Sequence, residues 1–444
     1  MDVEHRVVPA FVHGLSLGSM PDEVVRRGQT LLLDTLAVAA SGTATPVSAI
    51  VRRHAARHMG GGVNGARLLF DGRRVSPPGA AFANASTIDS FDAHDGHALT
   101  KGHAGVTVVP AALAFAEETG RMAGPAFLAA VVMGYELGTR AGIALHAEAL
   151  DYHTSGAWNA LAAAAIGARY LQLDAGRTQH ALGAAEFHGP RSQMMRCIDA
   201  PTMVKDGSGW GALAGVTAAL LAEDGFTGAP ALTVEAERHA VLWADLGRRW
   251  RIMEQYIKPY PVCRWAQAPM EAAQQMLAQH RLTANEIAAV TVRTFDAAVR
   301  LGSRQATNTE EAQYSTGFPL AALLVRGRVG ADEIAGSGLT DPAIAAMQSR
   351  IQVIEDEAIT RAFPATRSAI VEMQLNDGQV LVSDRTYTRG DPDSPLEEAA
   401  FQAKIEGLLE SLPPSRRRAL RQAVDALPDG GGVAPLLDAV MPAA

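Results

Sequence analysis

Long, alanine-rich apolar segments fill the first 260 residues, and they limit the possible folds of this chain more than any other feature. Residues 160–171 are almost all alanine and leucine, which predicts a helix buried on every side. Segments 111–118, 125–144 and 211–221 have the same character. Only 5% of the residues are aromatic, and an excess of small side chains favours closely packed helices over a sheet-rich fold.

The pattern changes after about residue 265. Segment 287–295 alternates between apolar and polar residues and is rich in β-branched side chains, so it predicts a strand. Asp377-Gly378 lies between two alternating runs, 370–375 and 379–382, which is typical of a β-hairpin. These strands, with helical patterns between them, predict an α+β unit.

Helical patterns return after the turn at residues 390–395. This order is explained by a second domain inserted between two parts of a helical domain. We therefore predict a mainly α fold with an α+β insert. Residues 1–266 and 396–444 form the large all-helical domain from both ends of the chain, and residues 267–395 form the smaller α+β domain.

Charge and cysteine content exclude several classes of protein. The 444 residues carry a formal net charge of −8, and the longest basic run, Arg416–Arg418, is too short to supply a nucleic-acid-binding face. Two cysteines, Cys197 and Cys263, cannot build a disulfide framework or hold an iron–sulfur cluster. No segment has the composition expected of a membrane span or a signal peptide. We expect a cytoplasmic protein with neither a nucleic-acid nor a membrane partner.

Lysine is rare in this chain. There are four lysines against 35 arginines, and three of the four lie in turns rich in glycine, proline or histidine: Lys101, Lys205 and Lys258. An ammonium group can transfer a proton, whereas a guanidinium group keeps it. We therefore expect these three lysines to have chemical roles, and we expect Lys404, in a predicted C-terminal helix, to lie on the surface.

Three aspartates and three histidines crowd into residues 89–103. Two interpretations remain open from the residues alone. Asp92, His94, Asp95 and His97 have spacings that can hold a divalent metal. The same side chains can act as general acids and bases around a carboxylate substrate.

Two further segments carry candidate binding groups. His153, Thr154 and Ser155 precede a buried helix, and they predict either an anion site at the helix N-terminus or simple capping with His153 exposed. Arg191, upstream of the glycine-rich turn around Lys205, can clamp a carboxylate. That turn lacks the spacing of a phosphate-binding loop, so we do not expect a nucleotide site.

The fourth segment, residues 256–267, contains two prolines at the expected domain boundary, where binding sites are common. It carries Lys258, Tyr260, Cys263 and Arg264. Cys263 is more simply explained as a buried structural residue than as a nucleophile.

Taken together, these segments resemble the MmgE/PrpD family, whose members include 2-methylcitrate dehydratase and cis-aconitate decarboxylase. The resemblance covers nearly the whole chain in the expected order. It rests on the following motifs: Phe91-Asp92 with His103 and 109–114, the His153 turn, Met203-Val204-Lys205, 225–228, 258–263, 311–315 and 390–392.

The resemblance implies a helical domain built from both chain ends, a smaller α+β lid, a pocket between them, homodimers and no required cofactor. By match, Asp92, His103, His153, Lys205 and Lys258 take catalytic positions, and Tyr314 falls near another. This chain departs from the family pattern at Ala93, His103-Ala104-Gly105, Ser208 and Gln267, and it has His94, His97 and Lys101 in exchange. These departures suggest an altered substrate.

The resulting expectation is a cofactor-independent lyase that acts on a small di- or tricarboxylate, with a 2-methylcitrate dehydratase-like elimination by general acid–base catalysis and no bound metal. The expected substrate-binding residues are His94, His97, Lys101, Arg191, Tyr260, Arg264 and Tyr314. A decarboxylase of a cis-aconitate-like acid and an epimerase or isomerase of a related carboxylate are alternatives. A metal-dependent hydrolase and a non-catalytic carboxylate binder remain as alternatives of other classes.

Overall fold

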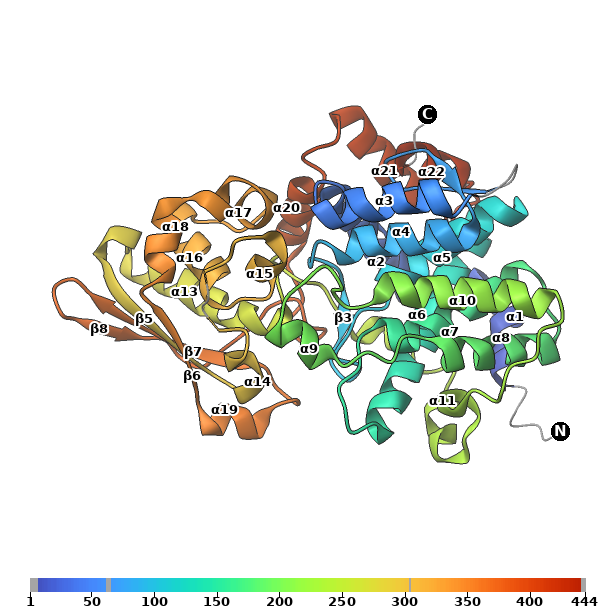
Figure 1. The fold of residues 1–444 in the computed structure, drawn as a ribbon, viewed down its shortest axis with the longest axis horizontal. Helices are drawn as coiled ribbons and strands as arrows, with labels where there is room; N and C mark the ends of the chain where they lie inside the picture. The colour runs from blue at the N-terminus through green and yellow to red at the C-terminus, as the bar shows by residue number, and fades with distance from the viewer. Residues whose placement is uncertain (1–6, 61–64, 303–304, 441–444) are drawn as a thin grey trace.

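The protein consists of a large helical body and a smaller α+β unit at opposite ends of its long axis (Figure 1). A computed structural model describes residues 7–60, 65–302 and 305–440. Its mainly α architecture with an α+β part confirms the predicted fold class.

Helices from the first half of the chain make up most of the body. They are α1 (Val7–Gly14), α2 (Asp22–Gly42), α3 (Pro46–His58), α4 (Pro77–Asp89), α5 (Gly105–Thr119), α6 (Gly124–Glu148), α7 (Gly156–Tyr170), α8 (Ala175–His188), α9 (Met194–Asp199) and α10 (Ser208–Glu223). Helices α7 and α10 pack so closely that a Cβ atom on Gly215 would lie 2.2 Å from the carbonyl oxygen of Ala160. The small residues seen in the sequence therefore serve helix-on-helix packing.

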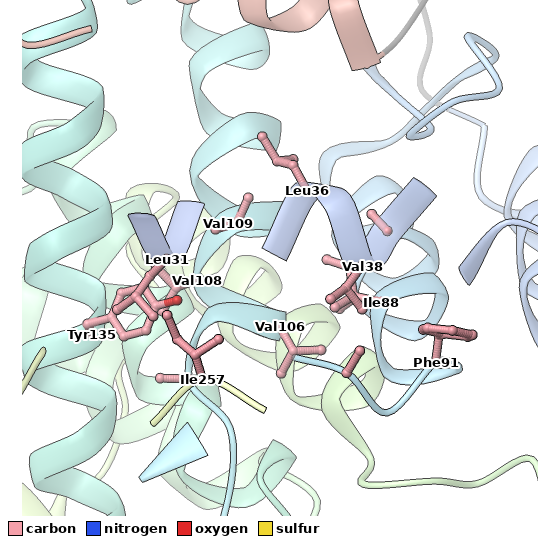
Figure 2. Close-up of a cluster of buried hydrophobic side chains, with 14 of the residues drawn as sticks. Leu31, Leu36, Val38, Ile88, Phe91, Val106, Val108, Val109, Tyr135 and Ile257 are labelled. Carbon is pink, nitrogen blue, oxygen red and sulfur yellow. The ribbon is translucent and has the colours of Figure 1, made fainter. Parts of the chain in front are cut away.

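The core of the body lies between α2, α4, α5 and α6. Figure 2 shows the fully buried side chains of Leu31 and Leu36 from α2 near Val108 and Val109 from α5. Helix α6 is long and apolar enough to cross a membrane by composition, but 94% of its apolar window is buried inside the protein, as in a core helix. Helix α6 is therefore covered by neighbouring parts of the fold.

The α+β unit contains a five-stranded sheet with strand order β6-β5-β7-β8, in which β9 also pairs with β7. The strands are β5 (Ile287–Thr294), β6 (Ile351–Glu355), β7 (Ser368–Leu375), β8 (Val380–Val382) and β9 (Thr386–Tyr387). Helices α13 (Gln267–His280), α16 (Gly317–Arg326) and α18 (Pro342–Gln348) accompany it. The predicted hairpin is present, and Gly378 in its turn has φ +89°, which favours glycine.

Strand β6 is an element that the sequence patterns did not predict. It pairs in parallel with β5, whereas β7 pairs with β5 in the antiparallel direction. A five-residue strand that follows a helix directly carries too short an alternation to be recognised without its pairing partner.

The C-terminal helices return to the body, where α20 (Glu398–Leu408), α21 (Pro414–Ala426) and α22 (Ala434–Val440) lie near α2 and α3 (Figure 1). The expectation that Lys404 lies on the surface is wrong. Its ammonium group lies 2.6 Å from the Asp34 carboxylate and donates a hydrogen bond to the carbonyl oxygen of Ala93. Helix α20 packs against α2, and this contact encloses the side chain.

Candidate active site between the helical body and the inserted unit

The segment between α4 and α5 carries five of the twelve candidate site residues: Asp92, His94, His97, Lys101 and His103. Strand β3 (Gly96–His97) pairs with β4 (Gln255–Tyr256) in antiparallel register. This pairing brings the loop after α4 next to the segment that contains Lys258. Asp92, His94 and Lys258 are all buried, so the sequence-distant groups meet in the interior.

Asp92 and Lys258 form an ion pair at the centre of this arrangement. The Lys258 Nζ atom lies 2.5 Å from Asp92 Oδ1 and 3.2 Å from the Asp92 carbonyl oxygen. Burial alone would raise the pKa of Asp92, but the ammonium groups of Lys258 and Lys205 outweigh it and hold that pKa below its ordinary value. Asp92 is therefore a carboxylate at neutral pH.

His94 lies between two carboxyl groups without a hydrogen bond to either. Its Nδ1 atom is 3.7 Å from Asp92 Oδ1, and its Nε2 atom is 4.0 Å from Asp89 Oδ1. Within the described parts of the chain, neither nitrogen has a hydrogen-bond partner, although the side chain is fully buried. Buried polar groups normally have hydrogen-bond partners, so an unpartnered buried imidazole indicates a functional role for His94.

His103 stacks obliquely beside His94, with 4.3 Å between the ring centroids. Its Nδ1 atom contacts the carbonyl oxygen of Asp95, and its backbone N–H donates to the Ser155 hydroxyl. Burial lowers the pKa of His103 to about 3 and lowers the pKa of His94 well below its ordinary value. Both imidazoles are therefore neutral at neutral pH.

Lys205 is linked to this cluster by a residue of the α+β unit. Its Nζ atom donates to Gln313 Oε1 at 2.7 Å and lies 4.6 Å from the centre of the Tyr314 ring. The same Oε1 atom accepts the Asp92 backbone N–H at 2.9 Å. The Gln313 Nε2 atom donates to the Ser90 carbonyl and to the Thr309 hydroxyl, so both the oxygen and the nitrogen of this amide are hydrogen-bonded. Gln313 thus joins Lys205 to the Asp92 loop across the two units.

The backbone of Lys205 has φ +48°, a left-handed conformation that is uncommon for a residue other than glycine. Strain of this kind collects at functional sites, where the surrounding structure over-determines the backbone. Burial lowers the Lys205 pKa, and the nearby carboxylates of Asp92, Asp89 and Glu310 oppose that change.

Asp89 and Asp206 form a second group of buried acids that the sequence analysis did not select. Asp89 Oδ2 accepts the backbone N–H groups of Asp206 and Ser208, each at 3.2 Å. Burial raises the pKa of Asp89 to about 6 and raises that of Asp206 well above its ordinary value. Asp89 ends the mainly apolar segment 77–89, which was the one available sequence signal, whereas Asp206 lies in the turn before α10 and its sequence neighbours gave no sign of burial.

Lys205 also borders two hollows that open toward the surface. One has a volume of about 380 Å³ and is lined by Asp89, Met203 and Trp210 among others. The second, of about 610 Å³, is lined by Thr154, Cys197 and neighbouring residues. Both volumes fall within the range of small-molecule sites.

The structure gives several other predicted site residues packing roles. Arg264 contacts Asp391 at 2.8 Å, donates to the Arg389 carbonyl and lies over the Tyr256 ring. The Tyr260 hydroxyl donates to Gln274, and His97 pairs with Glu254 at 3.1 Å. Arg264, Tyr260 and His97 therefore already have protein partners.

Gln267, one of the positions that depart from the family pattern, supports the turn that presents Lys258. Its amide nitrogen donates to the Tyr260 and Val262 carbonyls, and its oxygen accepts from Arg264. Gln267 thus has a structural role at this departure from the family pattern.

His153, Arg191 and Lys101 lie apart from the central contacts. The His153 backbone donates to His146 and pairs with Gln193, and none of its described contacts reaches Asp92 or Lys258. Arg191 is exposed, and Lys101 lies 5.3 Å from the Tyr152 ring centre. The structure thus brings together Asp92, His94, His103, Lys205, Lys258 and Tyr314, and places the other predicted residues around them.

Of the two interpretations of the segment before α7, simple capping by Thr154 or Ser155 is not observed. The Ser155 side chain makes no cap hydrogen bond; it contacts the Asp206 carboxylate and accepts from the His103 N–H. The Thr154 hydroxyl is buried with no partner in the described regions. The Asp206 carbonyl accepts the Gly156 N–H at the start of the helix. The helix N-terminus is therefore tied to the Lys205 turn.

Neither cysteine has the environment of a nucleophile. Both thiols are free and buried, and burial raises the pKa of each to about 12. A reactive thiol needs a lowered pKa. This agrees with the structural role expected for Cys263.

Family models match most of the chain. The MmgE/PrpD N-terminal domain matches residues 8–247, and the MmgE/PrpD C-terminal domain matches residues 260–429. The chain belongs to the MmgE/PrpD family. The resemblance drawn from its motifs is confirmed. The residues grouped around Asp92 and Lys205 come from both matched regions, except Lys258, which lies between the two.

Individual relatives match shorter parts of the MmgE/PrpD chain. The cis-aconitate decarboxylase-like protein oryM of Aspergillus oryzae is 27% identical over 237 residues, covering 49% of this chain and 46% of its own. The 2-methylcitrate dehydratase of Cupriavidus necator is 34% identical over 131 residues, 28% of this chain and 27% of its own. Human cis-aconitate decarboxylase is 30% identical over 187 residues, which cover 40% of this chain and 38% of its own. The matches thus span less than half the length of these curated relatives.

Proposed function

We propose that the protein is a lyase that acts on a small di- or tricarboxylate by general acid–base catalysis, with no cofactor. The observation that carries this proposal is the convergence of two buried ammonium groups, Lys205 and Lys258, on Asp92 next to the unpartnered imidazole of His94. The names of the relatives, which are a dehydratase and decarboxylases, support the reaction class.

The groups match what elimination from a citrate-like acid requires. A base must take a carbon-bound proton, and an acid must protonate the leaving hydroxyl. Cations must hold the substrate carboxylates and stabilise the enolate-like charge that develops. Asp92 and His94 supply proton acceptors, Asp89, whose pKa burial raises to about 6, supplies a carboxyl group that can exchange a proton near neutral pH, and Lys205 supplies a cation beside an open hollow.

Decarboxylation needs the same cations and a donor to the new carbanion, and epimerisation needs acid–base groups on both faces of the substrate. A product screen separates these reactions. The purified protein is incubated in D₂O with citrate, 2-methylcitrate, cis-aconitate and their hydroxy- or amino-substituted analogues, and products are followed by mass. We expect loss of water from one acid. Loss of 44 mass units as CO₂, or deuterium uptake without a change of formula, would replace dehydration by one of the alternatives. Ligand-induced stabilisation without any product would indicate a non-catalytic binder.

Gln313→Glu is expected to move the pH dependence of the reaction. The new carboxylate would lie against the Lys205 ammonium, favour its charged form and raise its pKa. If the charged form binds the substrate, the alkaline fall of kcat/KM moves to higher pH. Gln313→Met removes the hydrogen bonds without a charge, and it should lower kcat while leaving the alkaline limb at or below its original pH. A profile unchanged in both variants would contradict the role of Gln313 in holding Lys205.

We also propose a homodimer in the cytoplasm, with residues 267–395 acting as a lid over the helical body of residues 1–266 and 396–444. An exposed apolar surface around Lys205, formed by Met203, Val204 and Trp210, supports association of two copies. Trp210→Glu is expected to convert a dimer to a monomer in sedimentation at micromolar concentration. A wild-type protein that sediments as a monomer would contradict the proposal.

A further inference from the structure

Three potential metal ligands converge at the centre of the site from one segment of the chain. Asp92, His94 and His103 each offer a donor atom, and these atoms all lie within 4.8 Å of one another. In tetrahedral zinc sites, ligand bonds of about 2.0–2.1 Å place the donor atoms about 3.4 Å apart. The 3.7 Å between His94 Nδ1 and Asp92 Oδ1 is already close to that spacing.

His94 provides an independent observation that points to a ligand. The side chain is fully buried, and both ring nitrogens lack hydrogen-bond partners in the part of the chain that the structure describes. His103 is oriented as metal-binding histidines commonly are, since its Nδ1 atom meets the Asp95 carbonyl oxygen and its other nitrogen is left for coordination.

This set differs from the metal site suggested by sequence spacing. The other two members of that set are committed elsewhere: Asp95 contacts the Tyr135 hydroxyl and accepts the Gly105 N–H, and His97 pairs with Glu254. In the folded protein, His103 is the third potential ligand in place of Asp95 and His97.

We propose that Asp92, His94 and His103 form a site for one Zn²⁺-like divalent cation, and that occupation of this site inhibits the protein. Two imidazoles and one carboxylate are ligands that suit Zn²⁺ and Co²⁺. The Lys258 ammonium, 2.5 Å from Asp92 Oδ1, competes with the cation for the carboxylate. The inhibitory consequence rests on the proposed function, because the cation would occupy the groups assigned to proton transfer.

Cobalt titration of the full-length, chelator-treated protein tests the site without using activity. We expect one equivalent of Co²⁺ to bind and to produce visible absorption bands stronger than those of aqueous Co²⁺. His94→Ala should abolish these bands, and His188→Ala, at an exposed position at the end of α8, should leave them unchanged. Absence of the bands in the wild type, or their persistence in His94→Ala, would overturn the proposal.

Lys258→Gln gives an opposite and more specific expectation. Removal of the competing ammonium frees Asp92, so the variant should bind Co²⁺ at least about tenfold more tightly. Circular dichroism must first show that each variant is folded. Equal or weaker binding by a folded Lys258→Gln protein would place the cation elsewhere and overturn the proposal.

Activity measurements then distinguish this inference from the proposed function. Zn²⁺ should inhibit the chelator-treated enzyme, and removal of Zn²⁺ should restore turnover. Failed cobalt binding in an active enzyme would overturn the cation site and leave the lyase proposal intact. Cobalt binding in a protein whose turnover is lost on chelation and restored by one metal would retain the site and overturn both its inhibitory role and cofactor independence.

Discussion

Replacement of Lys205 by arginine is expected to lower kcat on the order of a hundredfold although the positive charge is kept. Lys205 donates to Gln313 at 2.7 Å beside the Tyr314 ring, in a buried place that a planar guanidinium does not fit. Arginine also cannot release its proton readily. Loss of one such charge-assisted contact in the transition state costs roughly 3 kcal/mol, which corresponds to this change in rate.

Lys205→Met separates charge from shape and serves as the companion variant. Because Lys205 is buried, Lys205→Arg also carries an overpacking cost of about 1–3 kcal/mol. Thermal unfolding must therefore show that both variants are folded before kcat is compared. All four lysines are at least partly buried, so the exposed Arg121→Lys is the control, with unchanged kcat. Near-normal turnover in either folded Lys205 variant would contradict the placement of the site.

Much of the fold could be predicted because its signals are local. The mostly apolar pattern of residues 160–171 corresponds to α7, and the Asp377-Gly378 turn corresponds to the β7–β8 hairpin. Strand β6 was missed because its stability comes from pairing with β5, about 60 residues away along the chain, and not from its own pattern.

The site was also predicted only where its signals are local in the sequence. The density of aspartate and histidine in residues 89–103 and the rarity of lysine pointed to Asp92, His94, Lys205 and Lys258, and the fold brings these together. Gln313 carried no chemical signal of its own, because an amide becomes important only when a second unit places it between Lys205 and the Asp92 loop. Arg264 was selected for its charge, but its guanidinium group pairs with Asp391 and donates to backbone carbonyls.

The burial of Lys404 could not be predicted from its own sequence context, because it depends on the packing of α20 against α2. This residue also gives the largest expected effect on stability. Lys404→Met is expected to destabilise the fold by about 3–5 kcal/mol, because it leaves the fully buried Asp34 carboxylate without its cation. It also removes the hydrogen bond to the Ala93 carbonyl, next to Asp92, so kcat should fall as well. Differential scanning calorimetry measures the effect as a lowered Tm, with Arg121→Met as the exposed control.

The double variant Asp34→Leu/Lys404→Met distinguishes an unpaired charge from loss of packing. Removal of both members of a buried ion pair is often neutral, whereas removal of one member leaves an uncompensated charge. The double variant should therefore recover most of the Tm lost in Lys404→Met, while kcat stays low because the Ala93 carbonyl remains without its donor. If the double variant melts no higher than Lys404→Met, the pair does not determine stability at this contact between α2 and α20. If it recovers both Tm and kcat, Lys404 has no role in positioning the Asp92 loop.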